Sequence, residues 1–197
     1  MKYFLRPRWP ELFAKNAVLG LSMLLAGSAT ARGQMPGMET QTAKPGTPVT
    51  SEAATASVTV GGGTIDIRYN TPHMRGRKIM GTVVPYGQVW RTGANPATTL
   101  ITSVPLKFGT LLVPPGTHTL YTLPGADEWK LIVNNETGQW GTEYKPEMDL
   151  GRVTMLAKTM SAPQEIMSIS FENSTANSTE LHVRWETTDR YVTITRP

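Results

Sequence analysis

The side chains best suited to binding chemistry lie in one irregular stretch, residues 70–97, which is too long for a turn. Its cationic, aromatic and amide side chains include Arg77, Lys78, Trp90, Arg91 and Asn95. An arginine can grip a carboxylate or a phosphate through two parallel hydrogen bonds, and an aromatic face can stack on a sugar ring. The stretch therefore predicts a binding module for a small polar or anionic ligand, such as a sugar or an organic acid.

Two more aromatic residues complete the predicted site. Tyr86 belongs to the same stretch, and Trp140 follows later in a glycine-flanked loop. We expect Tyr86 or Trp140 to form an aromatic wall of the pocket. A simpler interpretation gives each residue a structural role: Trp90 packs in the core, Arg91 pairs with a carboxylate that fixes the loop, and Asn95 caps a turn.

A hydrolytic enzyme is the second hypothesis. No G-x-S-x-G elbow follows the first 31 residues, and no H-E-x-x-H motif or glycine-rich phosphate loop occurs. Two carboxylates such as Asp66 and Glu143 remain candidates, because separation in sequence does not fix their distance in a β fold. Asp127 and Glu128 are adjacent in a predicted turn, where their side chains should diverge. The catalytic residues of this alternative stay unknown.

Metal and redox chemistry has little support in the composition. The chain has 3 His and no Cys, which excludes disulfides, thiol nucleophiles, cysteine zinc sites and iron–sulfur clusters. We expect no metal and no cofactor, and the residues that would be considered for a metal are His73 and His118. His182 is the least suited of the three, because strand alternation places it on an outward face with Glu180 and Arg184.

A protein-interaction module of the cell envelope is the third hypothesis. Trp140 and Tyr144 lie in a predicted loop, where a large aromatic side chain either plugs one end of the core or contacts a partner. The identity of a protein partner is beyond the sequence.

Charge argues against nucleic acid as a partner. The chain carries 19 Lys plus Arg against 15 Asp plus Glu, a formal charge of +4. Residues 1–31 hold 4 of the basic residues and 1 of the acidic ones, which leaves 15 against 14 for the rest. A net charge of +1 gives no basic surface of the kind that binds nucleic acid.

The basic N-terminal segment is predicted to be a signal peptide, residues 1–31. Basic residues precede an apolar run at 17–26, and Ala29-Thr30-Ala31 offers the small residues that a signal peptidase reads. The run is shorter than the roughly 20 residues of a membrane-spanning helix, so we expect no stable membrane insertion after cleavage. Export without cysteine favours a bacterial periplasm or the cell exterior. Residues 32–54, rich in Gly, Pro, Thr and Ser, are predicted to be a flexible leader.

The positioning elements are predicted to be strands in a single domain, residues 55–197. Apolar residues recur at every second position in short runs that Gly, Pro, Asn and Asp interrupt. The clearest runs are 57–60, 64–69, 117–123, 129–133, 152–158, 166–171, 180–186 and 190–195. About nine strands and little helix predict an all-β fold, an antiparallel β-sandwich or a partly closed barrel of jelly-roll or Greek-key type.

Several strings in the chain closely resemble one bacterial family. They are Gly76-Arg77-Lys78-Ile79-Met80-Gly81, Val84-Pro85-Tyr86-Gly87, Val89-Trp90-Arg91-Thr92-Gly93-Ala94-Asn95, Pro115-Gly116-Thr117, Trp129 and Gln139-Trp140-Gly141. The family is catalogued as domain of unknown function 2911, and the resemblance covers about residues 53–197. It implies an exported bacterial protein with the same β-rich fold and no assigned activity.

Overall fold

The computed structural model describes residues 51–197. The predicted signal peptide and residues 32–50 of the predicted leader lie outside the described residues. The described part contains eleven strands, one short 3-10 helix at Pro146–Met148 and no α-helix. The strands are β1 (Ser51–Val60), β2 (Gly63–Pro72), β3 (Thr98–Thr102), β4 (Leu106–Phe108), β5 (Leu111–Val113), β6 (Gly116–Leu123), β7 (Trp129–Asn134), β8 (Asp149–Lys158), β9 (Gln164–Glu172), β10 (Ser178–Glu186) and β11 (Thr188–Thr195).

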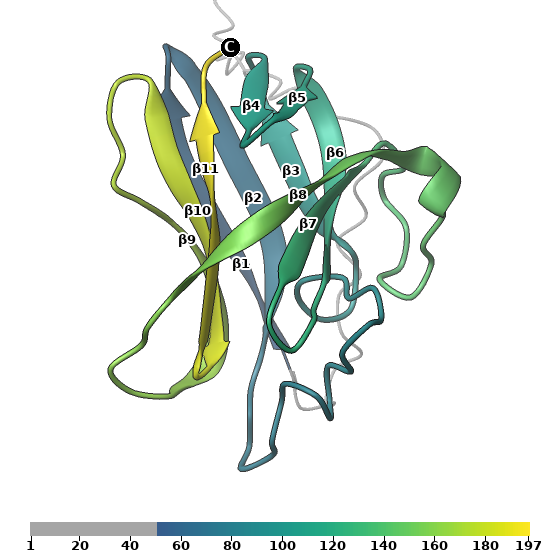
Figure 1. Ribbon diagram of the computed structural model, residues 1–197. Helices are drawn as coiled ribbons and strands as arrows, with labels where there is room; N and C mark the ends of the chain where they lie inside the picture. The colour runs from purple at the N-terminus through teal and green to yellow at the C-terminus, as the bar shows by residue number, and fades with distance from the viewer. Residues whose placement is uncertain (1–50) are drawn as a thin grey trace, which may run out of the picture. The chain divides into compact units, whose positions relative to one another are not determined.

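Nine of these strands form one curved path of antiparallel neighbours. Their order is β1-β2-β3-β6-β7-β8-β11-β10-β9, and β4 and β5 attach to β11 as a short hairpin (Figure 1). The long strand β8 joins the two halves, because residues 149–155 pair with β7 and residues 156–158 pair with β11.

The last strand of this path, β9, lies against β2 and the residue that follows it, near the other end of the path. Tyr69 on β2 receives a hydrogen bond from the Ile169 N–H of β9 at 3.0 Å, and His73 forms a β-bridge with Ile166. The predicted all-β architecture, a sandwich or a partly closed barrel with little helix, is confirmed.

The β1–β2 hairpin illustrates how sequence fixes register. Gly61 and Gly62 occupy the two central turn positions with φ values of 58° and 77°, which suit a type I′ turn and cost glycine little. Val60 therefore pairs with Gly63, and the register continues to Ser51 opposite Pro72. β1 begins at Ser51, four residues before the predicted start of the domain.

The main core fills the space inside the curved sheet. Alternation on β10 buries Leu181, Val183 and Trp185 there, as the sequence predicted. β2 contributes Ile65 and Ile67 to the same core, and both side chains are fully buried. Burial of these side chains supplies the main driving force for folding, about 1.5–3 kcal/mol for each large apolar side chain.

A second, smaller core lies on the opposite face of β6 and β7. Tyr121 and Ile132 are buried there with Ala97, and Val89 and Tyr144 pack against them. Val89 and Ala97 come from the connection 73–97, and Tyr144 comes from the connection 135–148. Both loops therefore lie over the outer face of the sheet. β6 and β7 are thus buried on both sides, and the two loops that carry the predicted site are held against them.

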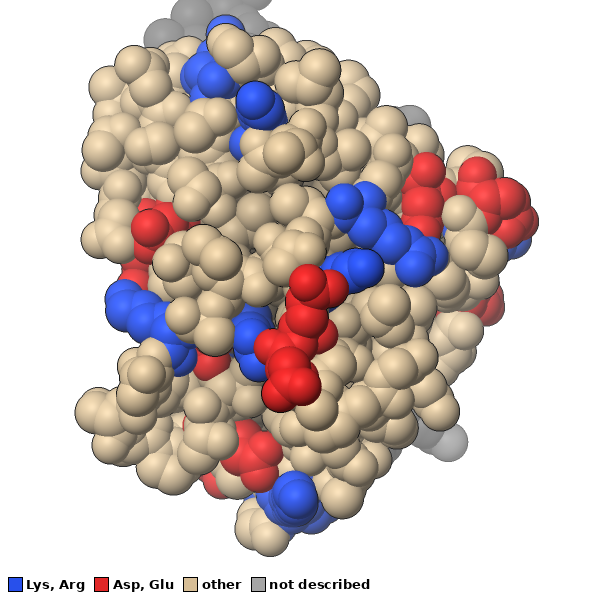
Figure 2. All heavy atoms as spheres, viewed as in Figure 1, with Lys and Arg blue, Asp and Glu red and all other residues tan. Residues whose placement is uncertain are grey.

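The face drawn in Figure 2 mixes the two signs of charge. Basic and acidic side chains lie next to one another there, with wide uncharged areas between them. Within residues 51–197 no helix is long and apolar enough to cross a membrane.

Candidate functional site

The 73–97 connection between β2 and β3 is attached to β9 and β10 by two carboxylates. Glu186 accepts hydrogen bonds from the backbone N–H groups of Ile79 and Met80 at 3.2 and 3.0 Å. Glu165 accepts one from the Arg75 N–H at 2.7 Å. Hydrogen bonds to ionised acceptors are stronger than neutral ones, so these contacts hold the first half of the connection in place.

Trp90 anchors the second half of the same connection. Its backbone exchanges two 2.8 Å hydrogen bonds with Thr122 on β6. Its indole stacks on Trp185 of β10 at 5.9 Å between centroids and meets the edge of Trp129 at 6.3 Å. The indole N–H donates to the Gly93 carbonyl at 3.2 Å. Trp90 therefore packs at the edge of the main core and leaves part of its side chain facing the rest of the 73–97 connection.

A tight turn follows Trp90 and fixes the direction of Arg91. Thr92 and Asn95 both have positive φ values, 54° and 61°, which are uncommon for residues with a Cβ atom. Thr92 is fully buried, and its carbonyl accepts a hydrogen bond from the Thr98 hydroxyl at 2.9 Å. These contacts fix the conformation of the turn, and with it the direction in which the Arg91 side chain leaves the backbone.

Arg91 is the most unusual charged residue of this region. Within residues 51–197 its guanidinium forms no hydrogen bond and no ion pair, and Nε is buried without a partner. Burial lowers the pKa of Arg91 from its ordinary value, because nothing compensates the desolvated charge. Its stem passes close to Gly141, where an added Cβ would lie 2.0 Å from Arg91 Cδ.

A pocket opens beside Arg91 and Trp90, with a volume of about 320 Å³. Its walls come from the 73–97 connection, the end of β2 and the end of β10. The lining residues are Pro72, Arg77, Val83, Val84, Pro85, Gln88, Val89, Trp90, Arg91, Gly93, Ala94 and Trp185. Two guanidinium groups line this pocket, and no carboxylate does.

The structure brings together three of the seven residues that the sequence nominated for ligand binding. Arg77, Trp90 and Arg91 line the pocket. Two residues that sequence reasoning missed, Gln88 and Trp185, also line it. The only sequence feature that could have pointed to Gln88 is its position in the irregular stretch 70–97. Trp185 comes from a strand almost a hundred residues later, where alternation identified it as a core residue.

The other four nominated residues do not line this pocket. Lys78 is exposed, and its carbonyl accepts a hydrogen bond from the Thr82 hydroxyl. Tyr86 is 45% exposed beside Gly81, and Trp140 is 40% exposed in its loop. Asn95 joins its loop to the 135–148 loop, because its carbonyl accepts a hydrogen bond from the Gly141 N–H at 3.1 Å.

The two histidines named as metal candidates lie in unrelated surroundings. His73 bridges to β9 through its backbone, whereas the His118 ring is buried with Nε2 3.0 Å from the Pro114 carbonyl. Among residues 51–197 no group of three or more His, Asp or Glu side chains could hold a metal ion. The carboxylates of the hydrolase hypothesis are also in different settings, since Asp66 bonds to Ser57 on β1 and Glu143 lies in the 135–148 loop.

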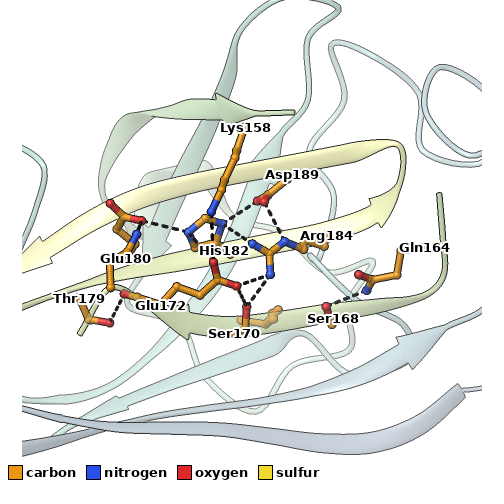
Figure 3. Close-up of polar contacts among 12 residues, drawn as sticks. Lys158, Gln164, Ser168, Ser170, Glu172, Thr179, Glu180, His182, Arg184 and Asp189 are labelled. Atoms are coloured by element: carbon orange, nitrogen blue, oxygen red, sulfur yellow. Dashed lines mark hydrogen bonds and ion pairs between the residues drawn. The ribbon is translucent and has the colours of Figure 1, made fainter. Parts of the chain in front are cut away.

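His182 corrects one expectation about the outer face of β10. It lies on the face opposite the core, as alternation predicted, but it is fully buried. The Tyr191 ring stacks on it, with 4.9 Å between the ring centroids. Asp189 Oδ1 lies 2.7 Å from Nδ1, and Glu180 Oε2 lies 3.3 Å from Nε2 (Figure 3). The outward face of a strand is therefore no guarantee of solvation when charged and aromatic neighbours close over it.

Arg184 bonds to two of the carboxylates near His182. Its Nε donates to Asp189 Oδ2 at 2.7 Å, and Nη1 bonds to Glu172, which also meets Lys158 (Figure 3). The Arg184 hydrogen bond lowers the pKa of Glu172 to about 2, and the two carboxylates raise the pKa of Arg184. We call His182, Arg184, Asp189, Glu172, Glu180 and Lys158 the β10 charge network.

The 135–148 loop is locked to the sheet by polar side chains. Tyr121 donates to the Glu143 carbonyl at 2.7 Å and accepts from Gln139 Nε2 at 3.0 Å. Tyr144 donates to Asp149 Oδ2 at 2.7 Å. Burial and this hydrogen bond raise the pKa of Tyr144 to about 12. The lock places Gly141 against the stem of Arg91 and so forms one boundary of the site.

Comparison with known proteins gives one match. A family model described as a protein of unknown function (DUF2911) matches residues 51–194. No curated protein and no solved structure gives a significant match to the chain.

Proposed function

The chain belongs to the DUF2911 family, and we propose that its domain is a binding module that holds a small polar or anionic molecule in the pocket beside Trp90 and Arg91. The family description assigns no activity, so the proposal depends on the site alone. The observation that carries it is the Arg91 guanidinium, which has no partner among residues 51–197.

An uncompensated guanidinium is costly in the unliganded protein. Desolvation of a charge without a counter-charge or hydrogen bonds is unfavourable, and proteins normally pair such groups. A bound anion supplies both the charge and the acceptor atoms that Arg91 lacks. Arg77, on another wall of the same pocket, adds a second positive charge.

The walls of the pocket are held by contacts within the chain. The carboxylates of Glu186 and Glu165 hold one half of the connection, and the stacked pair Trp90 and Trp185 holds the other. A pre-formed site loses less conformational freedom on binding, which favours affinity. Its volume of about 320 Å³ lies at the small end of the range for small-molecule pockets.

Binding is favoured over hydrolysis by the chemistry of the lining. Its side chains are aliphatic, aromatic, amide and guanidinium groups. None of these is an ordinary general base or nucleophile at neutral pH. The lining therefore supports recognition and offers no proton acceptor for a water molecule.

A thermal-shift screen of the full-length chain tests the proposal. Sugars, organic acids and phosphates are added in turn, since a ligand that binds only the native state raises the melting temperature. We expect at least one class to raise it, and Arg91→Gln to remove the shift. Arg196→Gln is the matched control, because Arg196 donates to the Pro105 carbonyl outside the pocket. A shift that survives Arg91→Gln, or no shift in any class, contradicts the proposal.

We also propose that the protein is exported, which rests on the signal pattern of residues 1–31. Expression in a bacterium followed by fractionation and N-terminal sequencing tests this. The expected product lies outside the cytoplasm and begins at Arg32. An intact N-terminus on cytoplasmic protein contradicts it.

A further inference from the structure

We infer that the ligand of this pocket is an organic acid, with a carboxylate held by Arg91 and a compact apolar body packed against the Trp90 wall. The inference rests on the proposed function, because it concerns the same pocket, and it names the ligand class. It excludes sugars as the main ligand.

The two cations of the pocket have different amounts of free hydrogen-bonding capacity. Arg77 donates from Nε to the Met74 carbonyl at 2.9 Å and from Nη2 to the His73 carbonyl at 2.8 Å. Arg91 donates to no atom of residues 51–197. Arg91 is thus the group that can offer a two-pronged contact to a planar carboxylate, whereas Arg77 contributes charge more than donors.

The other side chains of the lining are mostly apolar, although backbone atoms also reach the pocket surface. Its aliphatic members are Pro72, Val83, Val84, Pro85, Val89 and Ala94. The Trp90 indole adds aromatic surface, but its N–H is already bonded to the Gly93 carbonyl. A ligand body in this pocket therefore gains from burying hydrocarbon, at about 25 cal/mol per Å² removed from water.

A sugar does not suit such a lining. Each ring hydroxyl needs a donor or an acceptor, and a hydroxyl buried without one costs about 1–3 kcal/mol. Gln88 is the one uncharged polar side chain among the lining residues, apart from the indole groups, and no carboxylate is present to accept from hydroxyls. A bare phosphate satisfies the cations but leaves the aliphatic wall uncovered.

The test compares acids with neutral molecules of the same shape. Titration calorimetry on the full-length chain uses benzoate against benzamide, and isovalerate against isovaleramide. Methyl glucoside and inorganic phosphate are the arms for the other ligand classes. We expect at least one acid to bind ten-fold or more tightly than its amide, the glucoside and phosphate.

Two variants and one control define the role of Arg91. Arg91→Gln should weaken acid binding ten-fold or more, and Arg91→Lys should weaken it less, because lysine keeps the charge but not the planar fork. Arg196→Gln should leave acid binding unchanged. Circular dichroism and the melting temperature establish that each variant is folded.

The contrary outcomes separate the inference from the proposed function. Amides that bind as tightly as acids, or acids that bind equally to Arg91→Gln, overturn the inference. Binding of the glucoside or phosphate through Arg91, without binding of either acid, overturns the ligand class and leaves the binding module standing. Absence of acid binding at millimolar concentration overturns the inference, and a flat thermal-shift screen then overturns the proposed function as well.

Discussion

Two partly buried arginines of this domain have opposite surroundings. Arg184 is bonded to Glu172 and Asp189, and these carboxylates raise its pKa. Arg91 has no such neighbour among residues 51–197, and burial lowers its pKa. One cation is neutralised by carboxylates of the fold, and the other has no counter-charge among residues 51–197.

The difference separates charged residues that stabilise the fold from the arginine that we propose to bind a ligand. In the β10 charge network three carboxylates lie against one arginine, one lysine and one histidine, all of them from the described part of the chain. The pocket holds two arginines and no carboxylate. We expect changes to the network to alter stability, and replacement of the Arg91 side chain to alter binding with little effect on stability.

Asp189→Asn should have the largest effect on stability. Asp189 is buried and contacts both His182 and Arg184, so the neutral amide removes a buried negative charge that both side chains contact. We expect a loss of about 3–5 kcal/mol in the free energy of unfolding, measured with denaturant. Asp66→Asn, at a less buried carboxylate bonded to Ser57, is the control and should lose about 1 kcal/mol or less. Equal losses in the two variants would show that the network is not a stabilising unit.

Gly141→Ala should damage the pocket through its shape. The new Cβ would lie 2.0 Å from Arg91 Cδ and 2.7 Å from the Asn95 carbonyl oxygen, so the stem of Arg91 must move. We expect a loss of about 1–3 kcal/mol in stability and a ten-fold or greater loss in ligand affinity. Gly138→Ala meets no neighbour, although its φ of 80° adds backbone strain, and should leave the affinity unchanged. Calorimetry on both variants checks this, and unchanged binding by Gly141→Ala would place the ligand elsewhere.

Acid should weaken the β10 charge network when the Glu172 carboxylate becomes protonated. The pKa of Glu172 is about 2 in the folded protein and near 4.5 when unperturbed. Because the folded pKa is the lower one, its contribution to stability is complete above about pH 4.5 and is lost as the pH falls towards 2. Melting temperatures across this range should fall less steeply in Arg184→Gln than in the parent. Parallel slopes would contradict the assigned role of Arg184.

Glu186→Gln should loosen the pocket wall by a smaller amount. The glutamine amide has one acceptor oxygen where the carboxylate has two, so the N–H of either Ile79 or Met80 loses its acceptor, at a cost of about 1 kcal/mol or more. Hydrogen exchange of these two amides should become about five-fold faster. Amides of β2 are the internal control, since their partners lie in the sheet. Unchanged exchange at Ile79 and Met80 would mean that the carboxylate does not hold this segment.

Arg91→Met should change the stability of the unliganded protein least of all. Removing an uncompensated charge costs no ion pair, and the methionine stem keeps the contact with Gly141. We expect a change within about 0.5 kcal/mol, against a loss of about 3 kcal/mol for Arg184→Met. Denaturant unfolding of both variants sharpens the comparison. A loss of similar size at Arg91 would give that residue a structural role.

The parts of the fold that the sequence predicted are those governed by local chemistry. The two-glycine turn fixes the β1–β2 register, and strict alternation on β10 identifies its core face. β3, β4 and β5 escaped prediction because runs of three to five residues are too short to show a period. β6 and β7 carry apolar residues on both faces, since a loop covers the side that alternation assigns to solvent.

The site was predictable in part for the same reason. Residue types in the irregular stretch pointed to Arg77, Trp90 and Arg91, which the structure places in one pocket. Trp185 reaches that pocket only through the tertiary packing of β10 beside Trp90. The burial of His182 likewise depends on Tyr191 from the next strand, so alternation gave its face but not its exposure.

The connection that forms most of the pocket joins two neighbouring strands, because β2 and β3 pair directly. Residues 73–97 are therefore an enlarged hairpin loop, and the path of the chain through the sheet does not depend on their length. Each doubling of a flexible loop costs only about 0.6 kcal/mol in closure entropy. Insertions or deletions in the segment should therefore leave the order of the strands intact, provided that they spare the residues that contact Glu165, Glu186 and Trp185.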